Sequence, residues 1–410
     1  MKTVAIVVSC DTKSDEAQFM KGLFEQAGVN ALIVDMSVGL GLTQGYDVSR
    51  EEVFQSIGIR WEDVASKSKG DLITLSLDAV RQTIVTMYEK NTIQGIISMG
   101  GVQNTTVAAH AMQALPLGFP KVLATTIASG GRTFGPVVGN RDIVVIPSIS
   151  DFTGLNSVTR MIMKNAVACM VGMLELGSES LEKTDHLVVG ITLMGITNTA
   201  AIAAIDEFSK HGIEAIGFHS TGVGGQILEE LAEKGELDGV LDLTTHEITS
   251  EFFGGGFSYG PFKRLKRLLQ TNIPVVVVPG GLDFIDYDVT KVPFSLEERK
   301  YNMHNNTLAH IKITKQEAAS VGALFGRRLS LATGSPTIVL PTKGLRANTE
   351  EGGTLYDPAV DEVLINSILE NCGPSVEVKV IEGNLNTEEW GRKAAKVLIE
   401  VLTREKRLGV

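Results

Sequence analysis

Residues 3–35 read TVAIVVSCDTKSDEAQFMKGLFEQAGVNALIVD, and this stretch decides the fold. An apolar run of strand length, Thr3–Ser9, is followed by an amphipathic segment of helix length, Ser14–Ala27, and by a second apolar run, Ala31–Asp35. Such alternation is typical of a βαβ unit, in which parallel strands are buried on both faces. The sequence therefore predicts an α/β fold with mainly parallel sheets.

The same alternation continues through the rest of the chain. Further strands are predicted at residues 93–99, 121–125, 143–147, 186–192, 214–218, 239–242, 274–278, 337–340 and 375–380. Further helices are predicted at residues 71–90, 104–114, 155–176, 198–210, 224–234, 261–270, 315–329, 358–370 and 388–403. Two stretches differ: residues 49–68 are irregular, and residues 280–307 have no clear period, which favours a functional loop.

A short polar and charged stretch, Gly177–Thr184, separates two similar halves of the chain. Small and charged residues of this kind are common at domain boundaries, and the alternation of strands and helices restarts at His186. The chain has 410 residues, which is enough for about two to three domains. We therefore expect one α/β domain at residues 1–180 and a second at residues 181–410.

The charge balance argues against nucleic acid as a partner. Lys and Arg number 37 against 48 Asp and Glu, a formal net charge of −11, which repels a phosphate backbone unless one face is locally basic. The longest basic cluster, Lys263–Arg267, is short, and we interpret it as the solvated face of the helix predicted there. No specific nucleic-acid partner is expected.

Cysteine content and hydropathy indicate a reducing compartment and no membrane partner. The three Cys residues lie far apart, without the paired spacing of a zinc site and with an odd count for disulfides. No apolar run reaches the ~18 residues that a membrane span requires. Residues 1–10 superficially resemble a lipoprotein signal, but their apolar part is short, and a first buried strand is the preferred interpretation. A cytoplasmic protein is predicted.

Candidate binding residues follow the strands, because ligands of open parallel sheets bind beyond the carboxyl ends of the strands. Asp11, Thr12 and Lys13 come after the first strand, and Lys13-Ser14 resembles the end of a P-loop that lacks the glycines. An anion contact and a structural cap made by Asp11 or Thr12 both remain open.

A second loop, Gly100–Thr106, follows the strand at residues 93–99. Its paired glycines allow a ligand to approach the backbone, and the helix that begins near Asn104 offers N–H groups and a dipole that favour phosphate. An N-capped turn without a ligand is the alternative. Loops at residues 124–131 and 219–225 repeat this combination of hydroxyl residues and glycines, which favours a ligand with several phosphates.

Carboxylates also lie at strand ends, namely Asp142, Asp242, Glu247 and Asp283. Magnesium binds one or two carboxylates together with water and phosphate oxygens. Glu247 and Asp283 are therefore the predicted magnesium ligands, although a capping or turn role would explain each of them.

At these loops the chain resembles the ATP-binding domain family typified by the amino-terminal part of a plant tobamovirus-resistance protein, a family otherwise of uncharacterised function. The matching segments are residues 11–13, 47–52, 114–121, 126–130, 218–225, 243–247, 279–283, 304–305 and 353–358. They extend almost from end to end of the chain, and their order and joint presence are specific. One segment departs from the family: Gly100–Thr105 reads GGVQNT, where the family commonly reads GGSGGT.

The resemblance implies two Rossmann-like domains joined by a hinge, with a ligand cleft between them. It also implies ATP with magnesium as the ligand, and a homodimer. Met161, Met163, Met170 and Met173 of the helix predicted at residues 155–176 would leave an apolar surface for such a dimer. Burial of these side chains in the core of one domain is the alternative.

We therefore expect a protein that binds ATP or another phosphorylated small molecule, with slow magnesium-dependent hydrolysis or phosphoryl chemistry as an option. The predicted ligand-binding residues are Asp11, Thr12, Lys13, Gly100, Gly101, Asn104, Thr105, Thr106, Ser129, Gly130, Thr221, Gly222, Gly224, Gly225, His304 and Asn305. A nonenzymatic, nucleotide-switched binding module is one alternative. Another is a metabolic enzyme acting on a small carbonyl or carboxylate substrate, with His219 and Glu247 as catalytic acid and base.

Overall fold

The computed structural model describes residues 1–128, 135–177, 185–253, 263–290 and 298–405. The chain separates into two compact units, Met1–Glu182 (unit 1) and Lys183–Val410 (unit 2). Except for Gly177, the border stretch predicted at Gly177–Thr184 lies outside the described residues.

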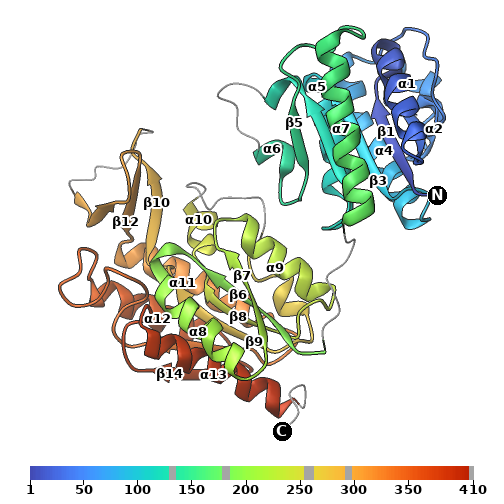
Figure 1. The fold of residues 1–410 in the computed structure, drawn as a ribbon. Helices are drawn as coiled ribbons and strands as arrows, with labels where there is room; N and C mark the ends of the chain where they lie inside the picture. The colour runs from blue at the N-terminus through green and yellow to red at the C-terminus, as the bar shows by residue number, and fades with distance from the viewer. Residues whose placement is uncertain (129–134, 178–184, 254–262, 291–297, 406–410) are drawn as a thin grey trace. The chain divides into compact units, whose positions relative to one another are not determined.

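Unit 1 is built on a five-stranded parallel sheet (Figure 1). Its strands are β1 (Thr3–Val8), β2 (Asn30–Asp35), β3 (Gly95–Gly100), β4 (Lys121–Thr125) and β5 (Val144–Pro147). They lie in the order β2-β1-β3-β4-β5, and every neighbouring pair is parallel. The second and third strands therefore flank the first, which makes the carboxyl ends of β1 and β3 the topological switch point of this sheet.

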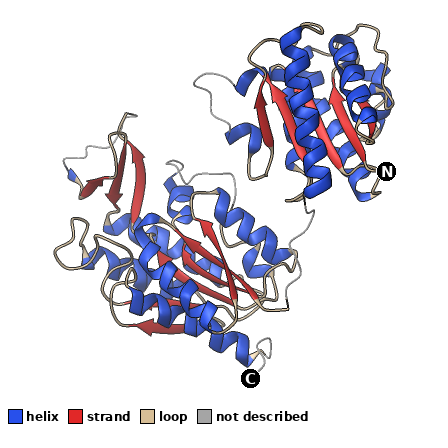
Figure 2. Cartoon of the chain, viewed as in Figure 1, coloured by secondary structure: helices blue, strands red, loops and turns tan. Residues whose placement is uncertain are grey.

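Helices cover both faces of this sheet (Figure 2). They are α1 (Cys10–Gln26), α2 (Arg50–Gln55), α3 (Trp61–Val64), α4 (Lys69–Glu89), α5 (Val102–Gln113), α6 (Gly135–Val138) and α7 (Ser157–Leu176). Alternate residues of β1 belong to two cores: Val4, Ile6 and Val8 pack with α1 and α7, and Ala5 and Val7 pack with α4 and α5. Burial of both faces explains the uninterrupted apolar run in the sequence.

Unit 2 contains a six-stranded parallel sheet in the order β14-β13-β9-β8-β6-β7. Its strands are β6 (Val188–Leu193), β7 (Glu214–His219), β8 (Gly239–Thr244), β9 (Val275–Gly280), β13 (Thr337–Pro341) and β14 (Glu377–Ile381). Its helices are α8 (Asn198–Lys210), α9 (Val223–Glu233), α10 (Glu247–Phe253), α11 (Lys315–Leu329), α12 (Pro358–Asn371) and α13 (Glu388–Arg404). The first strand of this sheet, β6, again lies between the second and the third.

The predicted fold class is confirmed: the chain is α/β, with two mainly parallel Rossmann-like sheets. The sequence did not reveal a small antiparallel sheet, β10-β12-β11, in the stretch expected to be a loop. Its strands are β10 (Phe284–Asp288), β11 (Tyr301–Met303) and β12 (Leu308–Lys312). Consecutive positions of β10 and β12 are buried, and they include the charged residues Asp286 and Lys312, so neither strand shows a simple alternation or an apolar run.

Several predicted helix bounds are corrected by the structure. The irregular stretch at residues 49–68 contains α2 and α3, and α1 begins at Cys10 rather than Ser14. The helix predicted at residues 261–270 is wrong for its described part, where turns at residues 264–267 precede a 3-10 turn at Leu268–Gln270. Within the described residues, no helix combines the length and the apolar character needed to cross a membrane.

The methionines of α7 do not form the apolar surface expected of them. Met163 and Met170 are fully buried in the core of unit 1, and Met173 packs against the same core. Met161 alone of the four is exposed. Because the side chains fill the core, the homodimer remains an expectation drawn from the family resemblance.

Candidate functional site

The carboxyl ends of β1 and β3 border a cavity of about 620 Å³ in unit 1. The first turns of α1 and α5 line it, and so does the segment that leads into α4. The lining residues with polar groups include Ser9, Asp11, Thr12, Lys13, Ser66, Lys67, Lys69, Gln103, Asn104 and Asp151. Five residues predicted from the sequence therefore lie around one cavity: Asp11, Thr12, Lys13, Gly101 and Asn104.

The N-terminus of α5 provides unpaired backbone donors at this cavity. Gly101 precedes the helix without a side-chain cap, and the first turn contains no acidic residue. Among the described residues, no acceptor is bonded to the N–H groups of Val102, Gln103 and Asn104. Unpaired N–H groups together with the helix dipole attract an anion.

The Asn104 side chain ties the ends of β1 and β3 together behind this helix N-terminus. Its Oδ1 accepts a 2.8 Å hydrogen bond from Ser9 Oγ, and its Nδ2 donates at 3.0 Å to the Met99 carbonyl. Gly100 has a φ of +142°, and a Cβ there would approach the Asn104 side chain to 2.8 Å. Glycine at this position therefore makes room for Asn104 rather than for a ligand.

Three lysines surround the cavity: Lys13, Lys67 and Lys69. None of them forms an ion pair with any residue that the structure describes. Lys13 lies at a distortion of α1 (φ −132°, ψ 19°), and its Nζ donates at 3.2 Å to the Thr12 carbonyl. Lys67 and Lys69 were not predicted as site residues, although the alternating sequence Ser66-Lys67-Ser68-Lys69 leads directly into α4.

Cys10 lies at the start of α1 and is buried beside Asp35. Asp35 accepts a 3.0 Å hydrogen bond from its backbone N–H. Burial, with the charge of Asp35 as the next cause, raises the pKa of the Cys10 thiol far above its ordinary value. Since the thiolate is the reactive form, these surroundings disfavour a nucleophilic role for Cys10.

The other residues predicted around Gly100–Thr106 do not reach the cavity. The Thr105 hydroxyl lies 2.5 Å from that of Thr125, and the Thr106 hydroxyl donates at 2.9 Å to the Val102 carbonyl. Both hydroxyls are therefore engaged within the fold. Ser129 and Gly130 lie outside the described residues.

In unit 2, the loop after β7 binds the side-chain carboxylate of Glu247. Glu247 Oε1 accepts from the backbone N–H groups of Gly222 (3.0 Å) and Gly225 (3.1 Å) at the N-terminus of α9. Glu247 Oε2 accepts from Ser220 Oγ at 2.9 Å. The position predicted for a phosphate on this helix N-terminus is thus taken by Glu247.

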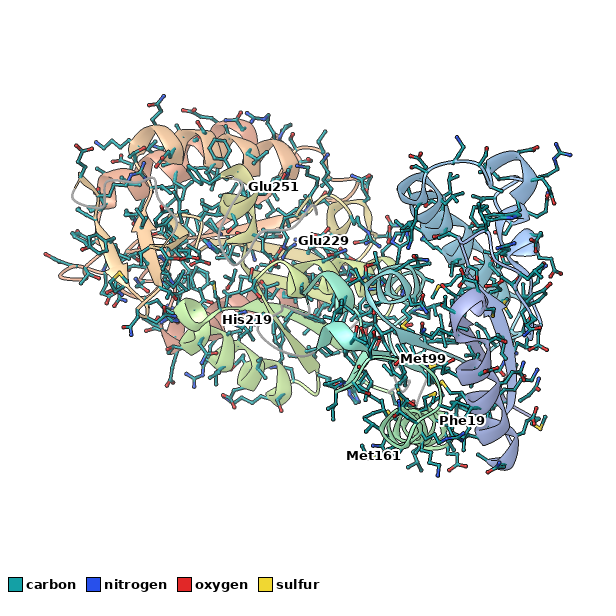
Figure 3. The ribbon with its side chains drawn as sticks, turned by 90° about the horizontal axis from the view of Figure 1, so that it is seen from above. Phe19, Met99, Met161, His219, Glu229 and Glu251 are labelled. Atoms are coloured by element: carbon teal, nitrogen blue, oxygen red, sulfur yellow. The ribbon has the colours of Figure 1, made fainter. Side chains whose placement is uncertain are left out.

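Arg264 completes this arrangement and corrects the interpretation of Lys263–Arg267 as a solvated face. Its guanidinium is fully buried and lies 2.6 Å from carboxylate oxygens of Glu229, Asp242 and Glu247. Lys263 pairs with Glu251 of α10 at 2.8 Å, so the basic run contacts carboxylates from both α9 and α10. Figure 3 labels these two carboxylates, Glu229 and Glu251. A buried arginine requires such paired charges.

Burial and ion pairing shift the pKa values of Arg264 and of two carboxylates bound to it. Burial raises the pKa of Asp242 to about 6, although Arg264 acts in the opposite direction. Burial also raises the pKa of Glu229. Burial lowers the pKa of Arg264, but the carboxylates outweigh burial, so that its pKa is raised overall.

Asp283, the other predicted magnesium ligand, is also bound to cationic side chains. Its Oδ1 accepts from Arg346 Nε at 2.9 Å, and its Oδ2 accepts from Lys312 Nζ at 2.8 Å. Although burial opposes the shift, these two cations hold the pKa of Asp283 well below its ordinary value. Both predicted ligands, Glu247 and Asp283, therefore have their oxygens engaged, and their surroundings do not fit magnesium.

The remaining predicted residues lie elsewhere in unit 2. His219 is exposed at the end of β7 (Figure 3), and no hydrogen bond to Glu247 is found in the described structure. His304 stacks on His310 with ring centroids 5.0 Å apart. Asn305 Oδ1 accepts from the backbone N–H groups of Thr307 (2.9 Å) and Leu308 (2.8 Å) in the turn between β11 and β12.

Comparison with known proteins places the chain among proteins without an assigned activity. Two family descriptions match it: the N-terminal domain of the uncharacterised protein family UPF0261 at residues 2–179, and the C-terminal domain of that family at residues 186–402. A UPF0261 protein of Clostridium tetani is 32% identical over 406 residues, covering 98% of this chain and 100% of that protein.

A plant protein and one solved structure are also similar. The ToMV resistance protein Tm-1(GCR237) of Solanum lycopersicum is 28% identical over 425 residues, and the match covers 97% of this chain but 55% of the plant protein. A UDP-GlcNAc 2-epimerase of Methanocaldococcus jannaschii, solved with UDP-GlcNAc and UDP, matches 98% of this chain at 11% identity and a TM-score of 0.22. A likeness that weak bears on neither ligand nor activity.

Proposed function

The chain belongs to the uncharacterised UPF0261 family, and from this premise we propose that unit 1 binds a phosphorylated small molecule, with ATP as the first ligand to test. The observation that carries the proposal is the unpaired N-terminus of α5 beside Lys13, Lys67 and Lys69. Free N–H groups and unpaired ammonium groups are complementary to phosphate oxygens.

The position and size of the cavity support this proposal. It lies at the switch point of an open parallel sheet, where ligands of such folds bind. Its volume of about 620 Å³ is within the range of small-molecule sites, roughly 300–1,000 Å³. The site therefore has room for a nucleotide as well as for a smaller phosphate ester.

Local charge also favours an anion. The chain as a whole carries −11, yet this cavity is lined by Lys13, Lys67 and Lys69 against Asp11 and Asp151. A local excess of positive charge raises the concentration of anionic ligands at a site. Any magnesium that accompanies the phosphate is assigned to Asp11 or Asp151, since magnesium uses one or two carboxylates with water and phosphate oxygens.

The proposal concerns binding rather than catalysis. Cys10 is held as a thiol, and Glu247 is bound to Arg264 in unit 2. The proposal therefore assigns no acid–base role to His219 and Glu247. A nucleotide-switched binding module is compatible with the same site.

Calorimetric titration of the full chain with ATP, ADP and inorganic pyrophosphate, each with and without magnesium, tests the proposal. Lys13→Ala and Lys69→Ala should each weaken binding by about 1.5–3 kcal/mol, the range for a lost hydrogen bond to a charged group. Lys90→Ala is the matched control, because Lys90 follows the last residue of α4 whereas Lys69 begins that helix. Unchanged affinity in both cavity variants, or no binding of any probe at millimolar concentration, would contradict the proposal.

A further inference from the structure

Unit 2 contains a second cavity, of about 780 Å³, that none of the predicted binding residues lines. It lies beyond the carboxyl end of β13, between residues 340–351 and one side of α12. Ligands of open parallel sheets bind at this edge of the sheet. The volume is again that of a site for a small organic molecule.

The walls of this cavity are largely apolar. Leu340 and Leu345 are buried, Ile365 is partly buried, and Leu369 and Val380 are 40% and 64% exposed. The cavity therefore presents apolar side chains to solvent at its mouth. Such a surface gains free energy when an apolar body covers it.

A buried carboxylate lies among these apolar walls. Asp361, on α12, is 7% exposed, and its Oδ1 accepts from Lys312 Nζ at 2.6 Å. The same ammonium group is shared with Asp283 at 2.8 Å. No donor within the described part of the chain reaches the second carboxylate oxygen of Asp361. A carboxylate oxygen that receives no donor from the protein, on a side chain largely removed from water, can accept a hydrogen bond from a ligand.

The charged residues around the cavity favour a ligand with a positive charge. Glu350, Glu351 and Glu362 line it together with Asp361, whose carboxylate is already paired with Lys312, and the lining contains a single lysine, Lys343. Lys343 is itself paired with a carboxylate outside the lining, at 3.1 Å. This excess of negative charge repels phosphates and carboxylates and attracts cations.

We propose that this cavity binds an organic amine, whose aromatic or branched aliphatic body packs against the apolar walls and whose ammonium group donates to Asp361. Its chemistry is the opposite of that of the cavity in unit 1, so the two sites take different ligands. The proposal does not depend on phosphate binding in unit 1.

Three probes of similar shape and different charge test this assignment in calorimetric titrations of the full chain. 2-Phenylethylamine should bind at least about tenfold more tightly than 2-phenylethanol, a preference of ~1.4 kcal/mol. 3-Phenylpropionate should bind more weakly than either. Equal binding of the acid and the amine, or no binding of the amine at millimolar concentration, would overturn the proposal.

Two variants show whether the amine occupies this cavity. Asp361→Asn should reduce the affinity for 2-phenylethylamine and leave that for 2-phenylethanol unchanged. Because Asp361 also holds Lys312, Leu369→Lys provides a second variant on the exposed wall, and its ammonium group should repel the probe. Leu331→Lys is the matched control, since Leu331 is 66% exposed and lies outside the cavity. Parental affinity for the amine in Leu369→Lys would place the probe elsewhere and refute the assignment.

Discussion

Arg264 Nε donates a 2.6 Å hydrogen bond to Glu247 Oε2, and Glu247 in turn accepts the N–H groups at the start of α9. The Gly-rich loop after β7 thus encloses an internal ion pair. Another loop with glycines and hydroxyl residues, after β3, leaves its helix N-terminus unpaired at a cavity. Similar loop sequences therefore have different roles in the two units.

Replacing Arg264 by Ala should destabilise unit 2 strongly. Glu229, Asp242 and Glu247 would be left in the interior without their cation, and breaking a buried pair costs about 3–5 kcal/mol. Urea unfolding of Arg264→Ala and of Lys266→Ala measures the difference, because Lys266 belongs to the same basic run but is exposed. A loss in Arg264→Ala no larger than that of the control would show that the cluster does not depend on its arginine.

Asp242 should make stability fall as pH rises from about 4 to about 6. Burial raises its pKa from 3.8 to about 6 in the folded protein, so between these values the folded state binds more protons than the unfolded state. The free energy of unfolding then decreases with increasing pH. Asp242→Asn lacks this titration, and its stability relative to the parent should therefore increase across the same window. A pH-independent difference between the two proteins would contradict the assignment.

Gly224→Ala should impair folding without changing the site in unit 1. A Cβ at Gly224 would collide with the backbone of His219, and overpacking of this kind costs about 1–3 kcal/mol. Gly195→Ala is the control, because no atom lies within 4 Å of a Cβ at that position. Thermal unfolding compares the two variants, and ATP titration of folded Gly224→Ala should match the parent because Gly224 does not line the unit 1 cavity.

Local patterns in the sequence were sufficient for most of the fold. Residues 4–8 are apolar at every position because β1 is buried on both faces, so the strand can be predicted from the sequence alone. Thr314 and Glu317 form a capping box, and α11 begins at Lys315 as expected. These features depend on residues that are close together in the chain, so the sequence alone is sufficient to predict them.

The sequence by itself determined the α/β class, the repeated strand–helix order and the polar loops after β1 and β3. Only the tertiary structure decided that the helix N-terminus after β3 is unpaired at a cavity, whereas the one after β7 binds the carboxylate of Glu247. Lys13 and Asn104 line the same cavity because β1 and β3 are neighbours in the sheet, although the residues are far apart in the chain. Arg264 is buried because Glu229 and Asp242, 35 and 22 positions away, meet it in the interior. Burial of a charge depends on such distant partners, and no local pattern of residues records them.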